Sequence, residues 1–167
     1  MTTFKIKAGE KYRTNHWWYF KFTMKNTISG TFEYWSGVKY DNGKGNKASN
    51  KIVGLSDSLY HMDNSIRIVS RWDLKEHKLE LRALIHEKGK RRTKHLCWLN
   101  SLECWDENSF YIEDRGLDYL VIINKGRLNE VSKVFKGESD YSFIRYVLLP
   151  YVEPVTNVDT VIDIKFD

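Results

Sequence analysis

Two arginines on one strand are the residues of this sequence best suited to holding an anionic group. Arg67 and Arg71 are four residues apart in the alternating segment SIRIVSRWD. Because side chains alternate between the two faces of a strand, both guanidinium groups lie on one face, about 13 Å apart. The other face carries Ile66, Ile68 and Trp72. Arginine binds phosphate or carboxylate with paired hydrogen bonds, so this strand predicts a polar face that is either solvated or built to hold an anion.

Neighbouring strands extend this polar face if they belong to the same sheet. The candidate ligand-binding residues on strands beginning at Trp17, Ser65 and Leu79 are Trp17, Tyr19, Arg67, Arg71, Arg82 and His86. Aromatic rings that stack on a base, beside guanidinium groups that bind phosphate, suit a nucleotide. A solvated face with cross-strand Arg–Glu pairs is the alternative interpretation.

A polar loop between two apolar strands, residues 56–64, adds His61 and Asn64 to the candidate ligand-binding residues. Loops at strand ends often carry binding residues, and His61 could donate a hydrogen bond to an anion or act as a base. No second histidine, cysteine or carboxylate lies at metal-ligand spacing from it. A structural role for His61, and a turn-forming role for Asn64, therefore stay open. We expect no metal and no cofactor.

Enzymatic motifs are absent from the sequence. It contains no G-x-S-x-G, no H-E-x-x-H and no phosphate-binding loop, so no catalytic residue is predicted. Asp159 and Asp163, four apart on one expected strand, are about 13 Å apart. That is farther than the roughly 5 to 9.5 Å that separates the two carboxylates of glycosidases. We expect a protein without enzymatic activity, with a hydrolase as the alternative.

Composition and charge limit the class of protein and its partners. The 167 residues are enough for one domain, and aromatics at 14% favour strands over helices. A net charge of +5 gives a mild preference for anionic partners. The basic run KGKRRTKH, residues 88–95, could neutralise phosphates or protect an edge strand from aggregation; nucleic acid is not the expected partner. No apolar run approaches the roughly 20 residues of a membrane span, so we expect a cytoplasmic protein.

Short strands must position these side chains, because apolar residues recur with a period of two throughout. The expected strands are 4–7, 17–24, 29–34, 52–55, 65–73, 79–86, 91–99, 109–113, 119–124, 133–135, 143–151 and 158–166. This pattern predicts an all-β protein: a single-domain, two-sheet antiparallel β-sandwich of jelly-roll type spanning residues 1–167. The Gly-, Asn- and Lys-rich segment 36–51 is expected to be a flexible loop that could cover a ligand.

A resemblance to known proteins rests on the string KIVGLSDSLYHMDNSIRIVSRWDLKEHKLELRALIHEKGKRRTKHL and on the C-terminal LLPYVEPVTNVDTVIDIKF. These segments resemble a group of small β-sandwich proteins from Bacteroidota and their phages. The glycine-rich turn usual in that group is replaced here by Val152-Glu153-Pro154. The resemblance implies a concanavalin-like jelly roll, and its phage members suggest a protein that sequesters a nucleotide immune signal.

Three functions follow as hypotheses. The leading one is non-catalytic sequestration of a small phosphorylated molecule, such as a cyclic dinucleotide or an ADP-ribose derivative, as phage counter-defence. The second is a carbohydrate-binding, lectin-like module with Trp17, Tyr19, Trp35 and Trp72 as stacking platforms. The third is a protein-binding decoy, and assembly into a homo-oligomer stays open. The two cysteines, Cys97 and Cys104, are expected to be reduced and structural.

Overall fold

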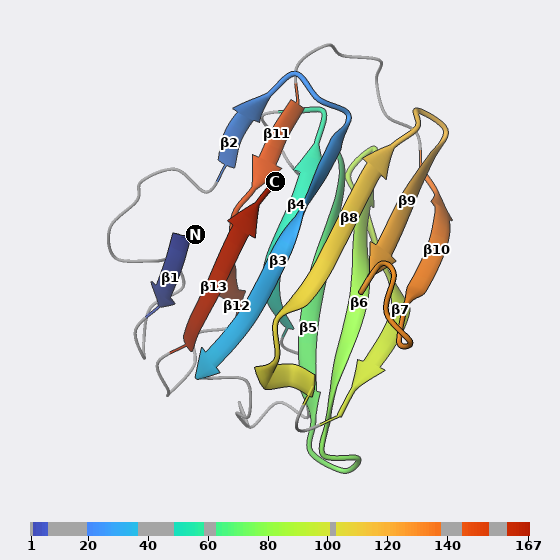
Figure 1. Ribbon diagram of the computed structural model, residues 1–167. Helices are drawn as coiled ribbons and strands as arrows, with labels where there is room; N and C mark the ends of the chain where they lie inside the picture. Colours follow the sequence, from blue (N-terminus) through green and yellow to red (C-terminus); the bar gives the residue numbers. More distant parts are fainter. Residues whose placement is uncertain are drawn as a thin grey trace.

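The chain folds into two antiparallel β-sheets that pack face to face (Figure 1). The computed structural model describes residues 2–6, 20–36, 49–58, 63–100, 103–137, 145–153 and 160–167. The predicted all-β jelly-roll sandwich is confirmed. The longest described helix is the three-residue 3-10 turn η1 (Glu103–Trp105), and none of the described helices is long and apolar enough to cross a membrane.

Sheet A forms the front layer in Figure 1, with six strands in the order β1-β13-β3-β8-β9-β10. Their bounds are β1 (Thr2–Ile6), β3 (Thr27–Ser36), β8 (Asn108–Asp114), β9 (Asp118–Ile123), β10 (Val131–Lys136) and β13 (Thr160–Phe166). The first and last strands of the chain pair with each other, so the two ends of the described chain lie in the same sheet.

Sheet B forms the second layer, in the order β2-β11-β4-β5-β6-β7, and its seventh strand, β12, also pairs with β4. The bounds are β2 (Phe20–Thr23), β4 (Ser49–Ser56), β5 (Asn64–Asp73), β6 (Lys78–Glu87), β7 (Lys90–Leu99), β11 (Arg145–Leu148) and β12 (Tyr151–Glu153). The expected strand 143–151 is therefore two strands. Pro150 lies between them, where its missing N–H cannot join a ladder.

The core lies between the sheets and is built from alternate residues of both. Phe32 and Ile112 from sheet A and Ile68 from sheet B are at most 1% exposed. A polar contact crosses this core: the hydroxyls of Tyr34 and Ser70 are 2.5 Å apart. Because Ser70 faces the core, the alternate residues of β5 face outward, as the sequence pattern predicts.

A β-bulge in β7 breaks the alternation. Arg82 pairs with His95 but Leu81 pairs with Cys97, so Leu96 is an extra residue. Leu96 and Cys97 both pack toward the core. His95 and Trp98, three residues apart, therefore share the outer face of sheet B, where their ring centroids are 5.5 Å apart.

A second bulge lies in β4. Lys51 pairs with Val69 and Val53 with Ile68, which leaves Ile52 as the extra residue. Ile52 and Val53 both belong to the core, so Lys51 is placed on the outer face. The expected loop 36–51 lies mostly outside the described residues, and its last three residues already belong to β4.

Candidate functional site

A cluster of charged side chains on the outer face of sheet B surrounds the carboxylate of Glu80. Arg71 Nη2 is 2.9 Å from Glu80 Oε2, and Arg82 Nε is 3.6 Å from Glu80 Oε1. His95 Nδ1 is 3.1 Å from Oε1. The Glu80 side chain is only 7% exposed, whereas the two arginines are about a quarter exposed. The carboxylate thus holds the guanidinium groups in place while part of each stays open to solvent.

Trp98 borders this cluster and supplies an open aromatic surface. It pairs with Glu80 across the β6–β7 ladder and is 41% exposed. Its contact with His95 orients the indole beside the charged groups. We call Arg71, Glu80, Arg82, His95 and Trp98 the Glu80 cluster. An indole next to partly exposed guanidinium groups can bind a ligand that has both a flat apolar surface and an anionic group.

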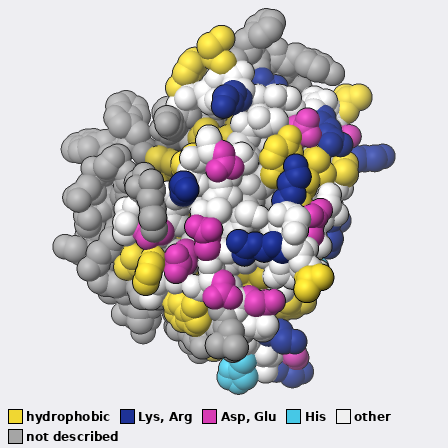
Figure 2. Space-filling model, viewed as in Figure 1, with side chains coloured by type: hydrophobic (Ala, Val, Ile, Leu, Met, Phe, Trp, Pro, Cys, Tyr) yellow, Lys and Arg dark blue, Asp and Glu magenta, His cyan; other side chains and the backbone are white. Residues whose placement is uncertain are grey.

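The two outer faces of the sandwich differ in charge. In the middle of sheet B, Lys51, Arg67, Arg71 and Arg82 accompany Glu80. On sheet A, Glu33, Glu107 and Asp163 line a small depression together with Lys165. Figure 2 shows acidic side chains gathered over the middle of the sheet A face. Lys51 and Arg67 are buried, so Arg71 and Arg82 are the cations of this group that an anionic ligand can reach from solvent.

Arg67 lies on the expected face but is buried. It is 1% exposed and pairs with Gly54 and Leu84 on the neighbouring strands. A Cβ atom on Gly54 would lie 2.4 Å from Arg67 Cγ, so the glycine makes room for the arginine. Arg67 thus sits beneath the surface, whereas Arg71 and Arg82 reach it. Its role in ligand binding stays a prediction.

His86 and Asn64 lie at the other end of the same face and are also buried. His86 is 8% exposed, and its Nδ1 is 3.3 Å from Ser65 Oγ. Asn64 accepts a hydrogen bond from the Lys88 amide and donates one to Asp57. Asn64 therefore ties the start of β5 to the β6–β7 turn, whereas a role in the turn before its own strand stays a prediction.

Trp17, Tyr19 and His61 lie outside the described residues. Trp72 is 5% exposed and faces the core, which excludes it as a stacking platform. Trp35 is exposed on sheet A and donates a hydrogen bond to Asp163. Strand β2, where Trp17 and Tyr19 were expected, does belong to sheet B, but β11 and β4 separate it from β5.

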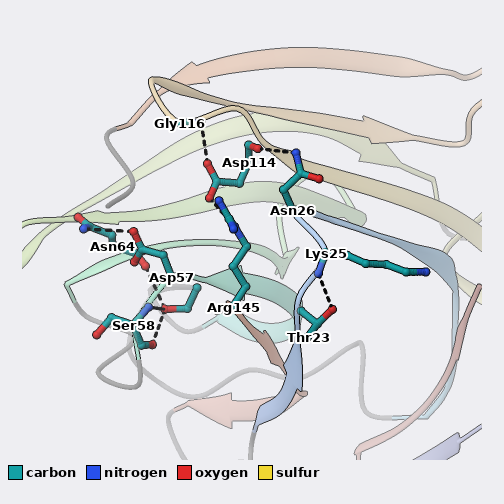
Figure 3. Close-up of polar contacts among 10 residues, drawn as sticks. Thr23, Lys25, Asn26, Asp57, Ser58, Asn64, Asp114, Gly116 and Arg145 are labelled. Carbon is teal, nitrogen blue, oxygen red and sulfur yellow. Dashed lines mark hydrogen bonds and ion pairs between the residues drawn. The ribbon is translucent and has the colours of Figure 1, made fainter. Parts of the chain in front are cut away.

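A polar network closes one end of the sandwich. Figure 3 shows Arg145, from β11, reaching across to Asp114 at the end of β8. Arg145 Nε is 2.9 Å from Asp114 Oδ2, and the Gly116 amide donates to Asp114 Oδ1. Burial raises the pKa of nearby Tyr119, and the negative charges of Asp114 and Asp57 raise it further. This network joins the two sheets.

Metal-binding and nucleophilic chemistry find little support in the described part of the chain. None of its groups of three or more His, Cys, Asp or Glu side chains could hold a metal ion. Cys97 is a free thiol, and burial raises its pKa to about 11, so it stays protonated near neutral pH.

Comparisons with known proteins establish the fold. An alginate lyase from Klebsiella pneumoniae has a TM-score of 0.63 at 13% identity, covering 84% of this chain and 59% of that one. A functionally unknown protein from Saccharomyces cerevisiae has a TM-score of 0.62 at 6% identity, covering 99% and 86%. A non-specific endo-beta-1,3(4)-glucanase has a TM-score of 0.53 at 8% identity, covering 87% and 57%. No family model and no curated protein matches the sequence. The shared fold is the concanavalin-like jelly roll.

Proposed function

We propose that the protein binds an acidic carbohydrate on the outer face of sheet B. The observation that carries this proposal is the Glu80 cluster, in which the exposed indole of Trp98 adjoins two partly exposed guanidinium groups. A sugar ring stacks on Trp98, and its carboxylate or sulfate accepts hydrogen bonds from Arg71 and Arg82. Glu80 fixes both arginines beforehand, which lowers the entropy lost on binding.

The structural neighbours support a carbohydrate over a nucleotide. These neighbours include alginate lyases, one of them in complex with a product, and a glucanase. Alginate is a polymer of uronic acids, so its sugar rings carry the carboxylates that arginine binds. Sequestration of a phosphorylated small molecule, the leading hypothesis from the sequence, stays the competing proposal. Arg71 and Arg82 would serve it too, but Arg67 is buried.

Binding without turnover is the form of the proposal that the described residues favour. Within the Glu80 cluster, Glu80 is the carboxylate, and it is engaged by Arg71, Arg82 and His95. Hydrolysis of a glycosidic bond ordinarily takes two carboxylates on opposite sides of the bond. The cluster holds a sugar chain in place but brings no second carboxylate to it.

Calorimetric titration at low and high salt tests the proposal. The probes are alginate oligosaccharides, neutral mixed-linkage glucan oligosaccharides and a cyclic dinucleotide. We expect saturable binding of alginate oligosaccharides that weakens with salt, because the arginines contribute charge. Trp98→Ala should weaken binding about 10-fold or more, as for a central aromatic anchor. Arg71→Ala should weaken it and reduce its salt dependence.

Trp35→Ala is the matched control, because Trp35 is also an exposed tryptophan but lies on sheet A. It should bind like the wild type. Failure to bind any saccharide, or equal losses in Trp98→Ala and Trp35→Ala, would overturn the proposed site. Oligosaccharides recovered after incubation should be unchanged in length and carry no new double bond. Shortened or unsaturated products would make the protein an enzyme instead.

A further inference from the structure

A cavity of about 250 Å³ opens at the end of the sandwich away from the Glu80 cluster, between β2 and β11 of sheet B and β3 and β13 of sheet A. Its walls include Phe22, Ile28, Val147 and Phe166. Ile28 and Val147 are core residues, whereas Phe22 is 55% exposed. The cavity therefore runs from solvent into the apolar interior. Figure 1 shows these segments meeting where the chain ends at β13.

The size and lining of this space fit one aromatic ring with a short polar extension. An apolar protein cavity of about 150 Å³ binds benzene, so about 100 Å³ remains here for further atoms. Two of the aromatic walls are fixed by edge-to-face contacts, Phe22 with Tyr146 and Phe166 with Phe110. Edge-to-face and stacked contacts are the arrangements that another ring would make with these walls.

Charges of both signs line the same cavity. Lys25 and Asp167 are lining residues, and both side chains are exposed. In the described part of the chain neither forms an ion pair, and they do not pair with each other. An ammonium and a carboxylate that stand apart beside an apolar space complement a ligand with one carboxylate and one ammonium group.

The cavity rim is held in place before any ligand binds. Figure 3 shows the turn between β2 and β3 against the end of β8. Asn26 donates from its side chain to the Asp114 carbonyl, and the Asp114 amide donates to the Asn26 carbonyl at 2.8 Å. The Lys25 amide donates to Thr23 Oγ1. A rim fixed by these hydrogen bonds loses little conformational entropy when it captures a small molecule.

We propose that this cavity is a second binding site, for a small zwitterion that carries one apolar ring, of the aromatic α-amino acid type. The ring occupies the space between Phe22, Val147 and Phe166. Its carboxylate faces Lys25 and its ammonium faces Asp167. The site is independent of the Glu80 cluster and does not depend on carbohydrate binding.

The test compares three probes by ligand-detected NMR and calorimetry: phenylalanine, 3-phenylpropionate, which lacks the ammonium, and phenethylamine, which lacks the carboxylate. We expect phenylalanine to bind at one site per chain and both analogues to bind at least about 5-fold more weakly. Lys25→Ala should remove the preference of phenylalanine over phenethylamine. Absence of saturable phenylalanine binding, or equal binding of all three probes, would overturn the proposal.

Two variants tie any binding to the cavity. Phe22→Ala removes an exposed wall residue, so the fold should be kept while phenylalanine affinity falls about 10-fold or more. Met24→Ala, at an even more exposed apolar residue outside the lining, is the matched control and should bind normally. Thr23→Phe, which fills the space, should abolish binding. Unchanged affinity in Phe22→Ala would place the ligand elsewhere and overturn the site.

Discussion

The ion pair between Asp114 and Arg145 should contribute strongly to stability, because it joins the two sheets in a buried setting. The two side chains are 2% and 10% exposed, and the atoms Arg145 Nε and Asp114 Oδ2 are 2.9 Å apart. Asp114→Asn keeps the shape of the side chain and the oxygen that accepts from Gly116. Its amide NH2 group replaces Oδ2, so the variant removes both the negative charge and the acceptor that faces Arg145 Nε.

The expected loss in the free energy of unfolding is about 3 to 5 kcal/mol, the usual cost of breaking a buried ion pair by removing one partner. Natural domains are stable by about 5 to 15 kcal/mol, so this loss is large. At about 2 to 4 °C per kcal/mol for a chain of this size, Tm should fall by about 6 to 20 °C. The double variant Asp114→Leu/Arg145→Met, which buries no charge at this pair, should be more stable than Asp114→Asn.

Urea unfolding followed by tryptophan fluorescence measures these differences. The matched control is Glu113→Gln, because Glu113 pairs with Arg115 at 3.0 Å but with side chains 25% and 41% exposed. Glu113→Gln should lower the free energy of unfolding by about 0 to 1 kcal/mol. A loss in Asp114→Asn no larger than in this control would refute the reasoning, as would a double variant less stable than Asp114→Asn.

Three further results follow from described contacts. Gly54→Ala should destabilise the fold by about 1 to 3 kcal/mol in urea titration, because the new Cβ would lie 2.4 Å from the Ile66 carbonyl oxygen. Rescue by Arg67→Ala would contradict this explanation, because that oxygen belongs to the backbone and stays in place when the Arg67 side chain is removed. Because burial raises the pKa of Cys97 to about 11, iodoacetamide should alkylate it far more slowly in the native protein than in urea at mildly alkaline pH, in a variant whose other cysteine is serine. Equal rates would show an accessible thiolate. Hydrogen bonds from the turn amides of Glu76 and Lys75 lower the pKa of Asp73. The ionised carboxylate therefore stabilises the fold above its unfolded-state pKa, and this stabilisation is lost as pH falls through its folded-state pKa. Asp73→Ala should be less stable than the wild type at neutral pH, and the two urea midpoints should converge in acid; a difference in midpoint that does not change with pH would contradict this.

The architecture could be predicted from the sequence because its strands alternate regularly. The expected strand 65–73 is β5 (Asn64–Asp73), and the expected strand 79–86 is β6 (Lys78–Glu87). Their register pairs Arg71 with Glu80, which brings together two polar residues that alternation alone places on the same face. Strand alternation alone therefore predicts that Arg71 and Arg82, two of the five residues of the Glu80 cluster, share one polar face.

The rest of the site depends on features that simple alternation does not encode. His95 and Trp98 are three residues apart, so a regular strand would put them on opposite faces. The adjacent apolar residues Leu96 and Cys97 were the local sign of the bulge. The space for Arg67 Cγ depends on the lack of a side chain at Gly54, on another strand. A contact between residues of two different strands cannot be predicted from the alternation of side chains within either strand.

The bulge in β7 also lets this strand carry one residue more than its partner without changing the binding surface. Removing the single residue Leu96 would restore the two-residue repeat in the same register, with His95 opposite Arg82 and Cys97 opposite Leu81, so neither flanking segment would have to turn over. Trp98 would still share the outer face with His95, and Leu99 would still face the core. The bulge thus takes up the extra residue locally and leaves the inside and the outside of the strand unchanged on either side of it.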